Sequence, residues 1–311
     1  MQPISLQPTI LPSDYCENGV YRAMNVTWAL TRKCSLACSY CTVCDRYSSY
    51  EPTEEVMQNT LRYIVEVVNT RKYAEIMLFG GEPTLHPQWM NILKHLRTHC
   101  KKTTTLNIFT NLHASADDYA RAQGEFDLGI ETSYHYGVDA FSYIDKVLKL
   151  SPRALQCYVM FDPRDIEGCK RVFYTLLDNG YYAELNRIHD KDLVLTKEQE
   201  AYMLAESLFN EKAIKRYLRY GYDNGGFKEF SFQQASMLGL DRFQGWQCSA
   251  GAANVFIECN GDVYPCQVYA NEGLPPVGNT NSLDASLQLP EETCKCIDCS
   301  CEIFLPKRLT K

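Results

Sequence analysis

The sequence predicts an α/β fold of the barrel type, on three observations. Strand patterns alternate with amphipathic helix patterns six times between residues 24 and 189, which indicates parallel strands joined by right-handed crossovers. No G-x-G-x-x-G follows the first strand, so an open dinucleotide-binding sheet has no positive support. The notable polar and thiol side chains follow strands, which is where a barrel carries its active face. A barrel is therefore preferred over an open doubly wound sheet.

The expected elements follow one another in regular order. Strands are expected at 24–30, 75–79, 105–110, 126–133, 156–161 and 182–189. Helices are expected at 53–69, 87–99, 114–122, 139–149 and 164–178, and a helix-rich stretch at 196–219 opens with a capping-box pattern, Thr196 and Gln199. These patterns divide the chain into an N-terminal segment (1–23), the barrel core (24–195), a helical and aromatic linker (196–246) and a small cysteine-rich C-terminal extension (247–311).

Composition excludes several classes of protein. The 311 residues include 31 basic and 38 acidic side chains, a formal net charge of −7, and no block rich in lysine or arginine. A nucleic-acid partner therefore has no electrostatic support. The apolar runs are too short to span a bilayer, and Met1–Tyr15 lacks the apolar core of a signal peptide. We expect a cytoplasmic protein with neither a nucleic-acid nor a membrane partner.

Cysteine is the residue type that stands out. There are 15 cysteines, of which four lie between Cys34 and Cys44 and seven between Cys248 and Cys301. An odd count without a signal peptide argues against a secreted disulfide scaffold. In a reducing compartment, clustered cysteines at short spacings indicate metal ligands.

The first cluster, Cys34, Cys38 and Cys41, has the spacing C-x3-C-x2-C. Three thiolates from one loop can hold three irons of a [4Fe–4S] cluster and leave the fourth iron without a protein ligand. A zinc site with Cys44 as the fourth ligand is the alternative. The loop follows the first strand, and Gly80-Gly81-Glu82-Pro83 follows the second.

With these two motifs the chain resembles the radical S-adenosylmethionine (SAM) superfamily over about residues 24–190. The resemblance implies a partial (β/α)6 TIM-like barrel, a [4Fe–4S] cluster on Cys34, Cys38 and Cys41, and SAM bound at the open iron. Reduction of the cluster then cleaves SAM to a 5′-deoxyadenosyl radical. The same resemblance assigns SAM contacts to Tyr40 near the adenine, to Gly80, Gly81, Glu82 and Pro83 at the methionine, and to Asn111 and Ser133. Glu82 is expected to accept a hydrogen bond from the methionine ammonium.

A second group of cysteines lies near the C-terminus. Cys248 and Cys266 flank a predicted hairpin, Val255–Tyr264, which turns at Asn260–Gly261 and so brings both thiols toward one metal site. The run resembles the twitch and SPASM extensions of radical SAM enzymes, which implies an auxiliary [4Fe–4S] cluster on Cys248, Cys266, Cys296 and Cys299. A four-cysteine zinc ribbon is the alternative. Cys259, Cys294 and Cys301 are left over, and one of them could replace a ligand.

The resemblance implies a radical SAM oxidoreductase or epimerase that abstracts a hydrogen atom from a small molecule such as a sugar or aminocyclitol. Two alternatives remain: a maturase that crosslinks or epimerises a ribosomally made peptide, and a non-catalytic Fe–S or zinc protein. Only 33 residues precede Cys34, which is too few for the leader-binding domain that many peptide maturases carry. The maturase is therefore the less favoured alternative. A flavodoxin or ferredoxin is the expected reductant. Cys44, Cys259, Cys294 and Cys301 are candidate hydrogen donors, and weaker polar candidates are His86, His135, Asp162, Arg187 and His189.

Overall fold

The computed structural model describes residues 3–8, 16–17, 20–41, 43, 52–188, 190, 192–209, 218–285, 289–295, 299 and 305–309. The larger of its sheets contains nine strands, in the order β15 (Gly278–Asn279), β14 (Asp262–Tyr264), β13 (Asn254–Ile257), β4 (Ala23–Thr31), β5 (Tyr73–Gly80), β6 (Thr104–Thr110), β7 (Leu128–Tyr134), β8 (Leu155–Phe161) and β9 (Tyr182–Arg187). Each strand from β4 to β9 pairs in parallel with the next. The predicted parallel α/β sheet is confirmed.

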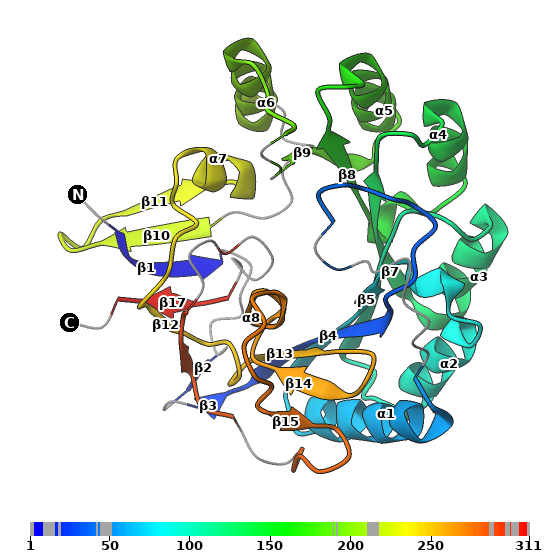
Figure 1. Ribbon diagram of the computed structural model, residues 1–311, viewed down its shortest axis with the longest axis vertical. Coiled ribbons are helices and arrows are strands. Elements are labelled where there is room, and N and C mark those ends of the chain that lie inside the picture. Colours follow the sequence, from blue (N-terminus) through cyan, green and yellow to red (C-terminus); the bar gives the residue numbers. More distant parts are fainter. Residues whose placement is uncertain are drawn as a thin grey trace.

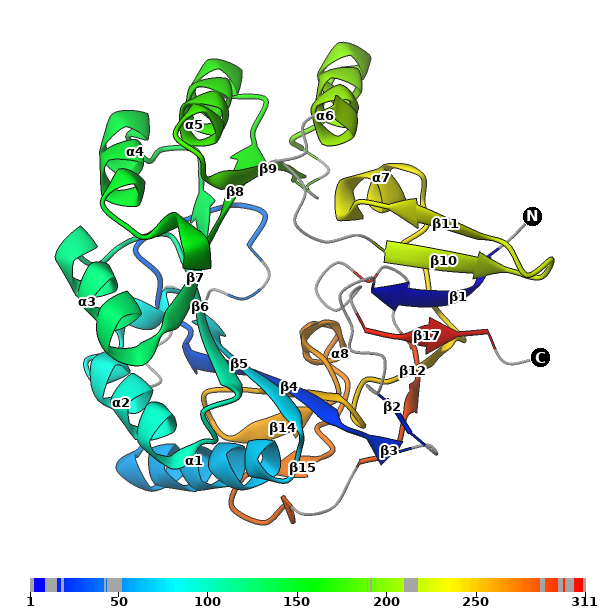
Figure 2. The same ribbon diagram turned by 180° about the vertical axis from the view of Figure 1, so that it is seen from behind.

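Helices cover the outer side of this sheet. They are α1 (Glu54–Asn69), α2 (Trp89–His99), α3 (Ala116–Phe126), α4 (Ala140–Leu148), α5 (Ile166–Asp178) and α6 (Lys197–Phe209). Two 3₁₀ helices lie in the connections, η1 (Pro83–Leu85) after β5 and η2 (Pro152–Ala154) before β8. Figures 1 and 2 show α1 to α5 on the convex side of the curved sheet, which remains open between β15 and β9. In β5, Ile76 and Leu78 are buried beneath the helices, whereas Met77 and Phe79 on the inner side are partly exposed. The arrangement is that of a partial barrel.

The C-terminal hairpin extends the same sheet. β13 pairs antiparallel with β14 and parallel with β4, with Phe256 opposite Thr27. The turn between the arms is completed by Gly261, whose φ of 85° lies in the left-handed region that glycine adopts without strain. The hairpin predicted at Val255–Tyr264 is therefore confirmed, and its turn lies beside the end of β4.

A second, antiparallel sheet lies across the open side of the arc (Figure 1). It joins, in order, β11 (Phe227–Phe230), β10 (Leu218–Tyr222), β1 (Pro3–Pro8), β17 (Lys307–Arg308), β12 (Gln247–Cys248) and β16 (Glu292–Thr293). Its core is formed by Leu6, Leu218, Tyr220, Phe243 and Trp246. Two short helices, α7 (Phe232–Met237) and α8 (Gln267–Asn271), and a ribbon of β2 (Cys16–Glu17) with β3 (Val20–Tyr21) complete the described part of the chain.

Several boundaries differ from the sequence prediction by one to four residues, and two of the differences have a clear structural cause. Helix α3 continues to Phe126 because Asp127, at φ 49°, is the residue that ends it, so β7 starts two residues later than expected. The helix-rich stretch predicted to 219 was wrong at its end, because Leu218–Tyr222 is a strand that pairs with both β1 and β11. The capping box predicted at its start is confirmed, since Thr196 and Gln199 exchange side-chain to backbone hydrogen bonds.

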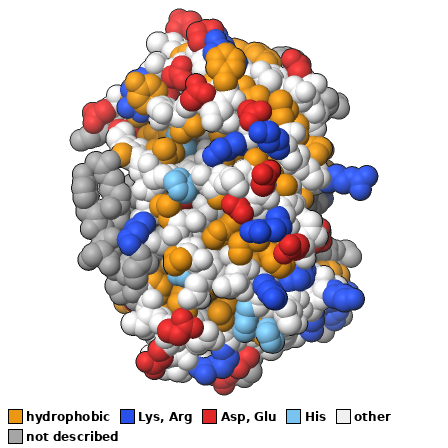
Figure 3. Space-filling model, turned by 90° about the vertical axis from the view of Figure 1, so that its right-hand side faces the viewer, with side chains coloured by type: hydrophobic (Ala, Val, Ile, Leu, Met, Phe, Trp, Pro, Cys, Tyr) orange, Lys and Arg blue, Asp and Glu red, His pale blue; other side chains and the backbone are white. Residues whose placement is uncertain are grey.

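The outer helical surface carries both signs of charge. Lysine and arginine side chains are interspersed with aspartate and glutamate on the face shown in Figure 3. That face therefore presents no extended field of one sign to a polyanion. Among the described helices, none has the length and apolar character needed to cross a membrane.

Candidate functional site

The cysteine loop, residues 32–41, leaves β4 and is joined to the end of β5 by two backbone hydrogen bonds. Gly81 N–H donates to Thr31 O and Glu82 N–H donates to Lys33 O, both at 2.7 Å. A Cβ at position 81 would lie 2.1 Å from Lys33 O, and one at position 80 would lie 2.3 Å from Thr31 O. Gly80 also has φ 131°, which side chains rarely allow. The two glycines thus permit the second strand to hold the start of the cysteine loop.

Cys34 and Cys41 both lie near enough to Cys38 to act on its thiol electrostatically. Burial raises the pKa of Cys38, a hydrogen bond with Tyr40 opposes this, and the charges of Cys41 and Cys34 raise the pKa further. Within the described ranges, no three ligating side chains are grouped tightly enough to hold one metal ion. A [4Fe–4S] cluster takes each thiolate on a different iron, so its ligands lie farther apart than those of a single ion. Three thiols on one loop are the number that such a cluster needs if its fourth iron is left for another ligand.

Glu82 is completely buried beside this loop. Its Oε1 accepts hydrogen bonds from Thr84 N–H (3.1 Å), Thr84 Oγ1 (2.5 Å) and Thr110 Oγ1 (2.8 Å). Its Oε2 accepts one, from Asn111 N–H at 2.8 Å. A buried carboxylate requires such donors, and Oε2 keeps the capacity for another. The protein therefore fixes the carboxylate and leaves an acceptor position on Oε2. The following residue, Pro83, is the first residue of η1, where its missing N–H costs nothing.

Asn111 connects Glu82 with the cysteine loop. Besides its backbone bond to Glu82, its Nδ2 donates to Cys34 Sγ at 3.5 Å and to Ser35 Oγ at 3.3 Å. The next residue, Leu112, has φ 59°, a conformation uncommon for a branched side chain. Its N–H is held by Thr110 Oγ1 at 3.0 Å. Asn111 therefore lies between the buried carboxylate and the first thiol of the motif.

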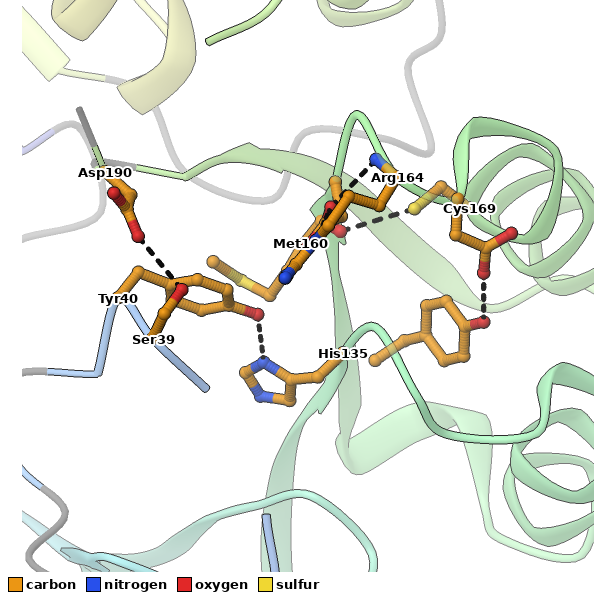
Figure 4. Close-up of polar contacts among 10 residues, drawn as sticks. Ser39, Tyr40, His135, Met160, Arg164, Cys169 and Asp190 are labelled. Atoms are coloured by element: carbon orange, nitrogen blue, oxygen red, sulfur yellow. Dashed lines mark hydrogen bonds and ion pairs between the residues drawn. The ribbon is translucent and has the colours of Figure 1, made fainter. Parts of the chain in front are cut away.

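A chain of hydrogen bonds crosses the mouth of the partial barrel (Figure 4). Tyr40 Oη lies 2.8 Å from His135 Nδ1, and His135 Nε2 lies 2.7 Å from Ser133 Oγ. Burial lowers the pKa of His135 to about 4, so its ring is neutral at pH 7. A neutral ring carries one N–H, so one of its two nitrogens donates in this chain and the other accepts. Ser133, itself buried, is thereby bonded to His135.

Two further strand ends hold the cysteine loop. Ser39 Oγ donates to Asp190 Oδ2 at 3.0 Å, just beyond β9 (Figure 4). Arg32 donates to both carboxylate oxygens of Glu258, at 3.2 Å and 2.6 Å, in the turn after β13. The loop therefore contacts residues that follow β5, β6, β7, β9 and β13. Asp190 and Glu258 were not predicted, and only their position directly after a strand marks them in the sequence.

Four C-terminal thiols also lie together. Burial raises the pKa of Cys299; Lys307 opposes this, and the charges of Cys248, Cys266 and Cys294 raise it further. Cys248 and Cys266 pack in one buried cluster with Ala250 and Leu305. The hairpin thus brings its two flanking thiols together, as expected. Cys294, which the spacing had left over, lies beside these thiols. Cys296 lies outside the described residues, as do Cys44, Cys301 and His189.

The weaker candidate site residues differ in the groups that they contact. His86 Nδ1 accepts from Gln88 N–H at 3.2 Å, which fits a residue at the start of a helix. Arg187 forms an ion pair with Glu200 at 3.0 Å. Asp162 is buried and its pKa is lowered, because the hydrogen bonds and charge of Arg164 outweigh the effect of burial. Cys259 is buried beside Arg32, and burial raises its pKa to about 11.

Comparison with known proteins addresses the family. Residues 28–154 match the family model described as the Radical SAM superfamily. This supports a radical SAM domain over that part of the chain. No curated protein matches the sequence.

Solved structures support the fold. Native anSMEcpe with bound AdoMet and the Kp18Cys peptide is similar at a TM-score of 0.58 and 16% identity, over 84% of this chain and 78% of that one. Streptococcus suis SuiB bound to the precursor peptide SuiA is similar at a TM-score of 0.56 and 13% identity, over 85% of this chain and 64% of that one. At such identities the likeness shows a common fold and nothing more.

The close approach of Gly81 to Lys33 O predicts that adding a methyl group at position 81 destabilises the fold. Gly81→Ala should lower the free energy of unfolding by about 1–3 kcal/mol, because its Cβ cannot share space with Lys33 O. The matched control is Gly124→Ala in α3, where a Cβ meets nothing within 4 Å, and which should raise stability by roughly 0.5–1 kcal/mol. Denaturant unfolding measures both. Equal effects of the two substitutions would contradict the contact.

Proposed function

We propose that this protein is a radical SAM enzyme that binds a [4Fe–4S] cluster on Cys34, Cys38 and Cys41 and abstracts a hydrogen atom from an organic substrate. One observation carries the proposal: three thiols lie on a loop fastened to the Gly80–Pro83 turn, beside the buried carboxylate of Glu82. The match of residues 28–154 to the radical SAM model supports it. A carrier or zinc protein has no evident use for this carboxylate, so a non-catalytic role is less supported.

The residues of the chain would bind and orient SAM. When bound, the cluster supplies the electron that cleaves SAM to a 5′-deoxyadenosyl radical. Glu82 Oε2 would accept a hydrogen bond from the methionine ammonium, while Asn111 holds Oε2 and Cys34 in a fixed relation. Tyr40, fixed by the neutral His135, would lie near the adenine. Gly80, Gly81, Pro83 and Ser133 would shape the same site.

Aromatic rings on the inner side of the sheet would exclude water from the radical. Phe79 packs edge-on against Phe109, with 5.8 Å between the ring centroids. Phe109 in turn stacks on Tyr158, with 5.7 Å between the ring centroids. These partly exposed rings come from three strands, β5, β6 and β8. Exclusion of solvent protects a reactive intermediate from side reactions.

The substrate class has two candidates. A small molecule, dehydrogenated or epimerised, is the main one, and a ribosomally made peptide is the second. The second has one observation in its favour, since anSMEcpe and SuiB, which share this fold, were each solved with a peptide bound. We place the enzyme in the cytoplasm with a flavodoxin or ferredoxin as reductant. Cys259 stays a candidate hydrogen donor, as do Cys44 and Cys301, which lie outside the described residues.

We also propose an auxiliary [4Fe–4S] cluster on the C-terminal thiols. The expected ligands are Cys248, Cys266, Cys296 and Cys299, and Cys294 is an alternative to Cys296, because its charge acts on both Cys248 and Cys299. Cys294 is positioned by its N–H, which donates to Trp246 O at 2.8 Å. Cys294 is thus a candidate ligand as well as a candidate hydrogen donor.

Anaerobic incubation with dithionite and SAM tests the main proposal. The wild-type protein should release 5′-deoxyadenosine and carry close to two clusters' worth of iron. The triple variant with alanine at Cys34, Cys38 and Cys41 should lose about half of the iron and all SAM cleavage, because the site that binds SAM is gone. Intact SAM with the iron-loaded wild type would refute the enzyme assignment and favour a carrier.

Single substitutions test the auxiliary ligand set. With Cys294 as the fourth ligand, Cys294→Ala should remove iron from the C-terminal site, whereas Cys259→Ala, a buried thiol outside that group, should retain it. Iron analysis and electron paramagnetic resonance of the reduced protein measure the loss. Retention of the full iron content by Cys294→Ala, with loss in Cys296→Ala, would favour the ligand set expected from spacing.

Glu82→Gln should weaken SAM binding while the iron on the cysteine loop is retained. A charge-assisted hydrogen bond is worth roughly 1.5–3 kcal/mol, so SAM affinity should fall about 10–100-fold. Thr84→Val is the matched control, because it removes a donor to Oε1 only and should lower stability more than affinity. A calorimetric titration with SAM compares the two. Equal affinities would show that Glu82 does not contact the ligand.

A further inference from the structure

The hydrogen-bond chain of Ser133, His135 and Tyr40, here called the relay, joins β7 to the far end of the cysteine loop. Ser133 is 2% exposed, and its Oγ lies 2.7 Å from His135 Nε2. On the other side of the ring, Nδ1 lies 2.8 Å from Tyr40 Oη (Figure 4). The two rings are inclined by only 22°, with 6.0 Å between their centroids. This arrangement suits a hydrogen bond at the edge of the imidazole ring, so β7 fixes the position of the Tyr40 hydroxyl.

The relay ends beside Cys38, the second thiol of the C-x3-C-x2-C motif. Burial raises the pKa of this thiol, whereas a hydrogen bond with Tyr40 lowers it. Burial also raises the pKa of Tyr40, and the negative charge and hydrogen bond of Cys38 raise it further. A bond that favours the charged sulfur and the neutral hydroxyl is one in which the hydroxyl donates. Tyr40 therefore keeps its proton at pH 7 and directs it toward the sulfur of Cys38.

The number of protons gives the relay one direction. A cysteine that ligates a cluster is a thiolate, which accepts hydrogen bonds and donates none, so the single O–H of Tyr40 is used on Cys38. His135 Nδ1 must then donate to Tyr40 Oη. The ring is neutral and carries one N–H, so Nε2 accepts from Ser133 Oγ. Each of the three side chains thus donates in the direction of the thiol.

A relay with this direction acts on the charge that the cluster has to accept. Reduction adds one negative charge to a [4Fe–4S] cluster, and hydrogen bonds to its sulfurs are among the features that set its potential. A donor stabilises the added charge and so makes reduction easier. Hydrogen bonds that follow one another in a line also polarise one another, so the last donor in the relay is stronger than an isolated hydroxyl.

We propose that the relay donates a hydrogen bond to the thiolate of Cys38 and thereby raises the reduction potential of the cluster on the cysteine loop. His135 is the positioning residue, because it orients the Tyr40 hydroxyl and acts on the cluster through it. This inference rests on the proposed function and deepens it by assigning control of the potential to named residues.

The test is a redox titration of the iron-loaded protein followed by electron paramagnetic resonance. The loop cluster is the one whose signal changes on addition of SAM. Tyr40→Phe and His135→Phe should both lower its potential, because the first removes the hydroxyl and the second removes the nitrogen that orients it. The double variant should shift the potential no further than the larger single shift, since both changes act on one bond. An unchanged potential in Tyr40→Phe, or additive shifts in the double variant, would overturn the proposal.

Two substitutions at position 135 distinguish the two ring nitrogens. The amide of His135→Asn lies near the position of Nδ1 and should restore most of the potential. The longer side chain of His135→Gln reaches the position of Nε2, beside Ser133, and should not restore it. Restoration by Gln in place of Asn would show that the contact with Tyr40 is not the one that matters, and would overturn the proposal.

Ser39→Ala is the matched control for a loosened loop. It removes the exposed hydrogen bond from Ser39 to Asp190, next to Tyr40, without touching the relay, and should leave the potential unchanged. A shift as large as that of Tyr40→Phe would contradict a specific role of the relay. Tyr40→Phe keeps its ring, so it decides the outcome even where His135→Phe fails to fold. A wild-type protein without a SAM-sensitive cluster signal would refute the proposed function and the relay with it, whereas an intact signal with unchanged potentials would refute the relay alone.

Discussion

The close backbone contact between the end of β5 and the start of the cysteine loop is the constraint on which the site depends. Gly81 and Glu82 donate to the carbonyls of Thr31 and Lys33, and positions 80 and 81 leave no room for a Cβ. Because β4 and β5 are adjacent parallel strands, their C-terminal ends lie at one edge of the sheet. The contact turns that proximity into a fixed relation between the three thiols and the carboxylate of Glu82.

The site is also notable for how its polar groups are satisfied. Glu82 receives hydrogen bonds from two threonines and a backbone N–H, so its charge can be buried without a cation. Asp162 is held by Arg164 instead. The two buried carboxylates are thus satisfied in different ways, one by neutral donors and the other by a cation.

The sequence predicted the sheet well, because hydrophobic alternation and helix periodicity are local signals. Each parallel strand from β4 to β9 lies within about two residues of its expected bounds, and the Asn260–Gly261 turn was placed by the need for a left-handed glycine. The strand at Leu218–Tyr222 was missed, because its partners β1 and β11 are required to recognise it.

Long-range contacts limited the prediction of the site in the same way. The thiol motif and Gly80–Pro83 are short patterns, readable from spacing alone. The position of Cys294 beside Cys248 depends on β12 and β16, which place Gln247 opposite Thr293, and spacing alone does not specify such pairing. Asp190 and Glu258 were missed because each becomes notable only through a residue remote in the sequence.

The smaller sheet has a consequence for the order in which the molecule is completed. Its central strands β1 and β17 are formed by residues about 300 positions apart, and β17 also pairs with β12, which carries Cys248. The parallel sheet from β4 to β9 needs only neighbouring strand–helix units, whose loops close early. The C-terminal thiols, in contrast, assemble only after residue 308 has been synthesised, because long-range pairing must wait for both partners. During translation the cysteine loop is therefore ready for iron well before the second group of thiols.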